Sequence, residues 1–86
     1  MDINQLIVIV KNKIEKEIRV ENIRIEDKSY IHKNHSGNID GKYHLKISIK
    51  SEELKKMRKI ESNKKIYKIL QDEMKQFIHS LQIFVN

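Results

Sequence analysis

The stretch that decides the fold is Lys42 to Lys50, KYHLKISIK, in which apolar and polar residues alternate from Tyr43 onward. The odd positions are apolar and the even ones polar: Tyr43, Leu45, Ile47 and Ile49 against His44, Lys46, Ser48 and Lys50. A period of two places these groups on opposite sides of an extended chain, which predicts a strand with one buried face.

A second strand is predicted upstream, over residues 20–27, where Ile23 and Ile25 alternate with polar side chains. Two strands joined in this way should pair antiparallel. The segment between them, residues 28–41, holds both glycines of the chain and is typical of a long polar loop. Three of the four histidines lie in or beside this loop: His32, His35 and His44.

A helix is predicted at the start of the chain, with Asp2 placed to cap it. Its apolar stripe recurs every three or four residues: Ile3, Leu6, Ile7, Val10, Ile14 and Ile18. Val8 and Ile9 lie outside this apolar stripe. Part of this segment is therefore either β-like or covered by another part of a protein. The mixture of Lys and Glu on its polar face favours packing against a core over binding to a membrane.

Two further helices and a final strand are predicted after the central strand. Ser51 should cap a short helix with the apolar residues Leu54, Met57 and Ile60. After a turn at Glu61 and Ser62, a longer helix begins, capped by Ser62 or Asn63. Its core face is Ile66, Leu70, Met74 or Glu73, Phe77 and Leu81, and His79 ends it. Alternation of Leu81, Ile83 and Val85 predicts the last strand.

The resulting order, α-β-β-α-α-β, predicts an α+β two-layer sandwich with helices on one face of a three-stranded sheet. With 86 residues the chain is one domain, residues 1–86. It has no Cys, which excludes disulfides, thiol nucleophiles and an all-Cys metal site. The net charge of +6 favours anionic partners, and no apolar run is long enough to span a membrane. We therefore expect a cytoplasmic protein.

Several local patterns resemble the BolA family, in order and spacing, from Leu6 to Val85. They are Asp27, Ser29, Tyr30 and His32 after the first strand, His44-Leu45 opening the second, Ser51 closing it, Ile66-Tyr67, and Ile78-His79-Ser80-Leu81. The resemblance implies a BolA-like fold, similar to the class II KH fold, and a non-enzymatic adaptor. Two positions depart from the family pattern: Leu54-Lys55-Lys56 replaces aromatic-X-Gly, and Ser62-Asn63-Lys64 replaces Arg-His-Arg.

The resemblance also implies a partner, a monothiol glutaredoxin, and a [2Fe–2S] cluster shared with that partner. The chain alone is expected to bind no cluster. Imidazole can replace thiolate on one iron of such a cluster. His32 matches the ligand position in the loop, and His35 is a second candidate metal ligand. Three interpretations of Asn63 stay open: a helix cap only, part of a cluster-free partner surface, or a site whose ligand comes from His32 or His35. The predicted partner surface is Tyr30, His32, Asn63, Lys64 and Lys65.

A different class of function is predicted by the basic residues around the turn between the second and third helices. The candidate nucleic-acid-binding residues are Lys55, Lys56, Lys59, Lys64, Lys65 and Lys68. KH domains carry a Gly-rich phosphate-clamping loop at this turn. Here the turn has no Gly, so only salt-dependent attraction to phosphates of DNA or RNA is expected, and a solvated helix face is the alternative. A triad of Asp27, Ser29 and His32 lacks an oxyanion-hole motif, so we expect no enzyme.

Overall fold

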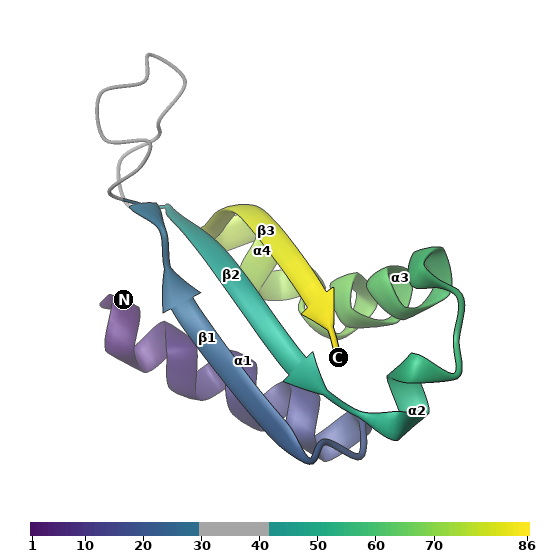
Figure 1. The fold of residues 1–86 in the computed structure, drawn as a ribbon. Coiled ribbons are helices and arrows are strands. Elements are labelled where there is room, and N and C mark those ends of the chain that lie inside the picture. Colours follow the sequence, from purple (N-terminus) through teal and green to yellow (C-terminus); the bar gives the residue numbers. More distant parts are fainter. Residues whose placement is uncertain (30–41) are drawn as a thin grey trace.

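The structure, a computed structural model, describes residues 1–29 and 42–86 (Figure 1). Three predicted site residues, Tyr30, His32 and His35, therefore lie outside the described residues. The elements are α1 Ile3–Glu17, β1 Asn22–Asp27, β2 Tyr43–Lys50, α2 Glu52–Lys55, α3 Lys59–Ile69, α4 Gln71–Gln76 and β3 Ile78–Val85. The predicted α+β order is confirmed, with α3 and α4 in place of the single long helix.

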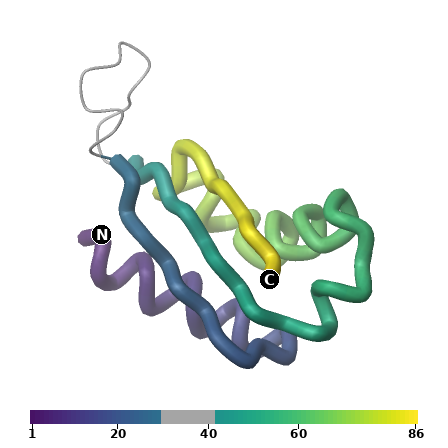
Figure 2. Tube along the Cα trace, viewed as in Figure 1, coloured from purple at the N-terminus to yellow at the C-terminus, as the bar shows by residue number. Residues whose placement is uncertain are grey.

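The three strands form one sheet in the order β1-β2-β3. β1 pairs antiparallel with β2, as predicted, and β3 pairs parallel with β2. Figure 1 shows α1, α3 and α4 on one side of this sheet, so no helix of the described residues covers its other face, which we call the open face. Figure 2 shows that the connection between α2 and α3 lies beyond the C-terminal end of β2, at the opposite end of the strand from Tyr43. The molecule is therefore two-layered, with one open face.

The core forms between the odd-numbered side of β2 and the helices. Leu45, Ile47 and Ile49 are at most 1% exposed, so the alternation in the sequence correctly identifies the buried face of β2. The helices contribute the other wall of this cluster: Leu6, Val10, Ile14, Leu54, Ile66 and Leu70. Each buried aliphatic side chain contributes about 1.5–3 kcal/mol, so this cluster is the main source of stability.

The first helix begins as predicted at an Asp2 cap. The Asp2 carboxylate accepts a hydrogen bond from the Gln5 backbone N–H at 2.8 Å, and the Gln5 side chain accepts one from the Asp2 N–H at 3.2 Å. This reciprocal arrangement satisfies two backbone donors that have no partner within the helix. Val8 is helical and 56% exposed, so the residues off the stripe do not become strand.

The predicted turn at Glu61 and Ser62 is wrong. α3 begins four residues earlier than expected, after Arg58, and Asn63 lies inside the helix and does not cap it. The Ser62 hydroxyl donates to the Lys59 carbonyl oxygen at 3.0 Å, so it caps no N–H either. No Gly or Pro occurs between residues 51 and 69 to mark the break, and the polar residues here are all tolerated within a helix. Ser51 does cap α2, accepting from the Leu54 N–H at 3.2 Å.

The predicted end of the long helix is also wrong. Helical structure stops at Gln76, and β3 already includes His79, which was expected to end the helix. A β-bulge explains the error: Tyr43 pairs with Ile78 and His44 with Ser80, so His79 is an extra residue on β3. Because of the extra residue, Ile78 and Leu81 both lie in the core although they are three positions apart. In the sequence, this spacing is the same as that of core residues in a helix.

Candidate functional site

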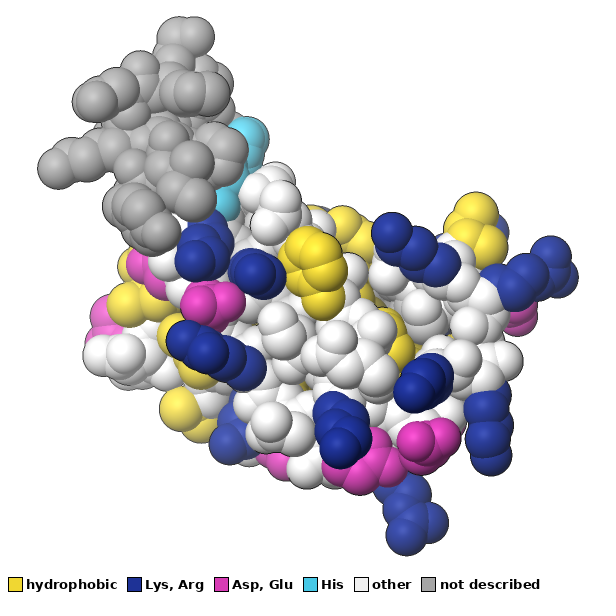
Figure 3. All heavy atoms as spheres, viewed as in Figure 1, with side chains coloured by type: hydrophobic (Ala, Val, Ile, Leu, Met, Phe, Trp, Pro, Cys, Tyr) yellow, Lys and Arg dark blue, Asp and Glu magenta, His cyan; other side chains and the backbone are white. Residues whose placement is uncertain are grey.

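Two histidine rings meet near the start of β2. The ring centroids of His44 and His79 are 4.8 Å apart, and the ring planes are nearly perpendicular, at 80°. His44 is buried, at 6% exposure, whereas His79 is exposed. Figure 3 shows histidine surface, in cyan, at one end of the molecule on the side of the open sheet face. The pair thus presents one accessible imidazole supported by a second that is held in place. We call it the histidine pair.

His44 is fixed by hydrogen bonds on its side chain and backbone. Its Nδ1 shares a hydrogen bond with the Ser80 hydroxyl at 2.6 Å. Its backbone N–H donates to the Ser29 hydroxyl at 3.1 Å, and the Ser29 N–H donates to the Asp27 carboxylate at 2.9 Å. Asp27 and Ser29 therefore join the end of β1 to the start of β2, a structural role for two residues of the predicted triad.

The bulge explains why His79 is accessible although it lies between two core residues of β3. Ile78 and Leu81 are buried, at 2% and 8% exposure, but the extra residue between the paired positions is turned away from the core. Bulges often re-aim a side chain beside a functional site. An exposed neutral imidazole has a nitrogen available for a proton or a metal ion. The His79 side chain can therefore serve as a ligand to a metal ion.

The histidine pair does not form a complete metal site among the described residues. In residues 1–29 and 42–86, no three His, Cys, Asp or Glu side chains gather closely enough to hold an ion. Any metal bound through His79 would therefore need ligands from outside this part of the chain. The predicted metal ligands His32 and His35 remain predictions.

The structure separates the predicted residue Asn63 from the histidine pair. Asn63 is half-buried and lines a groove with the end of β3, including Val85, which pairs with Ile49. His44 precedes Ile49 by five residues in β2, so this groove is about 17 Å farther along the sheet. The geometry does not bring Asn63 to the histidine pair, and the partner role of Asn63 and Lys64 stays a prediction.

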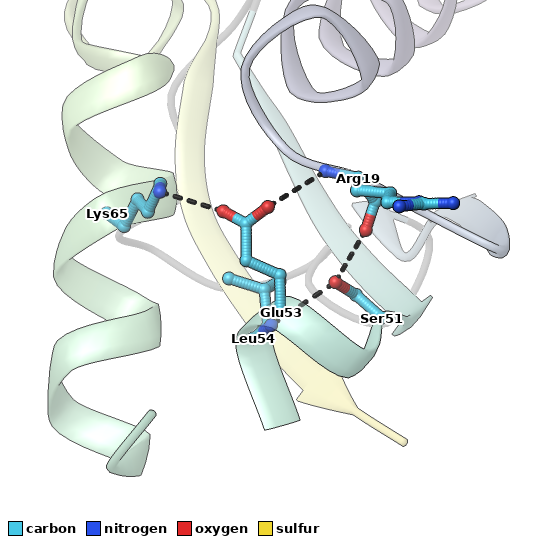
Figure 4. Close-up of polar contacts among 5 residues, drawn as sticks. All are labelled: Arg19, Ser51, Glu53, Leu54 and Lys65. Atoms are coloured by element: carbon cyan, nitrogen blue, oxygen red, sulfur yellow. Dashed lines mark hydrogen bonds and ion pairs between the residues drawn. The ribbon is translucent and has the colours of Figure 1, made fainter. Parts of the chain in front are cut away.

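Lys65, predicted for both partner and nucleic-acid binding, is part of a structural junction (Figure 4). Its Nζ lies 2.9 Å from Glu53 Oε2, and the other oxygen of Glu53 accepts from the Arg19 N–H at 3.2 Å. These contacts hold the pKa of Glu53 below its ordinary value, chiefly through the Lys65 hydrogen bond. Ser51 completes the junction by donating to the Arg19 carbonyl oxygen at 2.7 Å. Lys65 therefore connects α3 to α2.

Four of the six predicted basic residues line two grooves, two residues in each. Lys55 and Lys59 line the groove that holds Asn63, together with Met57 and Phe84. Lys65 and Lys68 line a second groove, between α1 and α3, with Lys13 and Lys16. No pattern in the sequence groups Lys13 and Lys16 with Lys65 and Lys68, because about 50 residues separate the two pairs. Lys56 and Lys64 are exposed.

Comparison with known proteins identifies the family of this chain. The family model described as BolA-like protein matches residues 14–86. The chain belongs to the BolA-like family. The resemblance inferred from the sequence is thus confirmed. Members of this family are generally regulators or adaptors without enzymatic activity. In the described residues of this BolA-like protein, no helix is long and apolar enough to cross a membrane.

Two curated relatives are similar over most of the chain. The DNA-binding transcriptional regulator BolA of Haemophilus influenzae is 32% identical over 75 residues, 87% of this chain and 70% of the relative. The SufE-like protein 1, chloroplastic/mitochondrial, of Arabidopsis thaliana is 33% identical over 79 residues, but the chain spans only 21% of it.

Solved structures share the fold. The BolA domain of SufE1 from Arabidopsis thaliana has a TM-score of 0.76 and 29% identity, with 92% of this chain and 87% of that chain covered. BolA1 from the same organism has a TM-score of 0.76 and 26% identity, covering 91% and 86%.

Proposed function

We propose that this protein is a non-enzymatic adaptor that binds a monothiol glutaredoxin and contributes an imidazole to a [2Fe–2S] cluster carried by that partner. The observation that supports the proposal best is the exposed His79, raised on a bulge beside the fixed His44. His79 is the candidate ligand that we propose among the described residues, in place of Asn63, which lies inside α3. The function would be cluster handling or iron regulation.

The chemistry of the chain fits a shared cluster. The sequence has no Cys, so thiolate ligands must come from the partner, and imidazole is a known replacement for thiolate on one iron. The Ser80 hydroxyl holds His44 at Nδ1, and His44 in turn packs edge-on against the His79 ring. This support would keep the exposed imidazole oriented toward a docked partner. His32 and His35 remain candidates for a second contribution.

The deciding experiment mixes the protein with a cluster-loaded monothiol glutaredoxin and follows the visible absorption and circular dichroism of the cluster. We expect His79→Ala to abolish the spectral change that the unmodified protein produces. Asn63→Ala, at the other end of the sheet, is the matched control and should leave the spectrum unchanged. The proposed ligand role is refuted if His79→Ala gives the same spectrum and cluster lifetime as the unmodified protein.

A second experiment separates partner binding from cluster ligation. Amide shifts of the labelled protein on adding cluster-free glutaredoxin report docking alone. Shifts around His44 and His79 would place the partner at the histidine pair, whereas shifts confined to the residues around Asn63 would place it at the groove. No shift with either form of glutaredoxin would reject this class of partner.

A second candidate function, nucleic-acid binding, is favoured by the groove that Asn63 lines. Lys55 and Lys59 are both exposed and line this groove, so their charges can reach phosphates of a strand lying in it. The Haemophilus influenzae relative is named as a DNA-binding regulator. The test is the affinity for DNA and RNA at increasing salt. Binding through these two lysines should fall with salt, and Lys55→Gln with Lys59→Gln should reduce the slope by about 2.

A further inference from the structure

The open face of the sheet carries two rows of polar, charged and aromatic side chains between the histidine pair and the C-terminal ends of β2 and β3. Arg24, Ser48 and Phe84 form one cross-strand row, and Glu26, Lys46 and Gln82 form the next. All six occupy positions that alternate with the core residues, so they project from the uncovered face. Figure 3 shows this side of the molecule, with several Lys and Arg side chains around a hydrophobic one.

Phe84 is the exposed aromatic residue in this row. Its side chain is 49% exposed, while Ile83 and Val85 on either side are half-buried and pack against the core. The Lys46 Nζ lies 5.0 Å from the centre of the Phe84 ring, within the range of a cation–π contact. A single exposed apolar residue needs no explanation in itself. Because the Phe84 ring is about half exposed on the open face, another planar group can stack on it when the Lys46 ammonium moves off the ring.

Positive charge flanks Phe84 on both sides. On the sheet, Arg24 and Lys46 lie 3.4 and 4.0 Å from Glu26, the single acid among the outward-facing residues of the described strands. One carboxylate cannot neutralise both cations. On the other side, Phe84 lines the same groove as Lys55 and Lys59. A chain of phosphates crossing this edge of the sheet would thus meet cations before and after the ring.

We propose that the sheet face around Phe84 binds single-stranded nucleic acid, with an unpaired base stacked on the Phe84 ring. Phosphates on either side would contact Lys46 and Arg24 or Lys55 and Lys59. Bases in a duplex are already stacked and paired, so an exposed ring on a flat sheet selects single strands. This inference rests on the second proposed function and names its ligand and its contact surface. It is independent of the glutaredoxin proposal.

The first test uses the absence of Trp from the sequence. Phe84→Trp introduces one fluorophore at the proposed stacking position, and stacking by a base should quench its emission. The probes are oligo(dT), oligo(rU) and a duplex of matched length at low salt. Quenching by either single strand and not by the duplex supports the proposal, and the two single strands distinguish DNA from RNA. Unchanged emission while a strand is bound overturns it.

The second test measures affinity with variants that fold. Phe84→Leu removes the ring but keeps an apolar side chain, and should weaken single-strand binding roughly 5- to 100-fold. Phe84→Tyr should restore it. Lys46→Gln should weaken binding, with Lys11→Gln, an exposed lysine of α1, as the charge-matched control. Thermal unfolding verifies that each variant is folded.

The outcomes distinguish base stacking on Phe84 from binding through the groove of Lys55 and Lys59. If the unmodified protein binds single strands and Phe84→Leu binds equally well while Lys55→Gln with Lys59→Gln is weakened, stacking is refuted and groove binding survives. If the unmodified protein binds no nucleic acid at low salt, both are refuted.

Discussion

The two ends of the open sheet face are built from different chemistry. At the start of β2, the buried His44 is held by hydroxyl groups, and His79 alone is presented to solvent. Farther along the sheet, Phe84 lies beside Lys46 and lines a groove with Lys55 and Lys59. One small sheet can therefore hold the proposed ligand site, which depends on hydrogen bonds, apart from the proposed nucleic-acid surface, which depends on charge. Changes at one end should leave the other intact.

The largest expected effect comes from the strand that the two ends share. Ile47 is fully buried and pairs with Ile25 on β1 and Ile83 on β3. Ile47→Ala should lower the free energy of unfolding by about 2–5 kcal/mol, because it leaves a cavity at the centre of the core. Urea unfolding measures this loss. The control is Ser48→Ala on the open face, which should stay within about 0.5 kcal/mol. Equal losses would mean that the sheet has no buried face here.

The next effect concerns the end of the sheet where β2 leads into α2, near Lys55 and Lys59, which we call the lysine end. Ser51 is fully buried, caps α2 and also donates to the Arg19 carbonyl oxygen at 2.7 Å. Ser51→Ala should cost about 1–2 kcal/mol of unfolding free energy, because two backbone groups lose their partner. The amide chemical shifts of residues around α2 should change, and the amide chemical shift of His79 should not. Large shifts at His79 would show that the two ends are coupled.

At the other end of the sheet, beside the histidine pair, we expect a smaller loss of unfolding free energy. Ser80→Ala removes the 2.6 Å hydrogen bond to His44 Nδ1 and should cost about 1 kcal/mol of unfolding free energy. The His44 ring should then become more mobile, which broadens the His79 ring resonances. Single-strand binding at Phe84 should not change. Ring resonances that stay sharp would show that Ser80 does not position the pair.

The smallest effect is electrostatic and again belongs to the lysine end. The pKa of Glu53 lies below its ordinary value, so the ionised form stabilises the fold. This contribution is complete above the unfolded-state pKa, about 4.3, and is lost as pH falls through the lower folded pKa. Unfolding measured between about pH 3 and 6 should show it, and Glu53→Gln should flatten the curve. An identical acid dependence in the variant would remove Glu53 as the cause.

At alkaline pH, the Lys13–Glu73 pair makes the stability of the fold decrease as the pH rises. Lys13 Nζ lies 2.7 Å from Glu73 Oε2, and this hydrogen bond raises the pKa of Lys13. Its contribution is present below the unfolded-state pKa, about 10.4, and is lost as pH rises through the folded pKa. Lys13→Gln should therefore remove part of the alkaline loss of stability, and Lys11→Gln should not.

Most of the fold could be predicted because local pattern and tertiary structure agree. The alternation in β2 identified its buried face, and Asp2 and Ser51 marked the helix starts where capping hydrogen bonds form. The prediction failed where tertiary pairing overrode the local pattern. The bulge gives Ile78 and Leu81 a helical spacing although both lie in a strand, so His79 was assigned to a helix.

The candidate site was harder to predict than the fold. The Ile78-His79-Ser80-Leu81 pattern was visible in the sequence, but only the pairing of β3 with β2 brings His79 to His44. The groove that joins Lys13 and Lys16 to Lys65 and Lys68 likewise depends on how α1 packs on α3. Such contacts between distant segments leave no periodic signal in the sequence.

The bulge at His79 has a consequence for how this position can change over evolutionary time. Because the extra residue keeps Ile78 in phase with the core, losing it by deletion would shift a hydrophobic residue into water. Exchanging its side chain changes the ring contact with His44 but disturbs no packing in the core, since the residue is exposed. Position 79 is thus hard to delete and easy to vary. A lineage, or a protein engineer, could try a new functional group there without first rebuilding the scaffold.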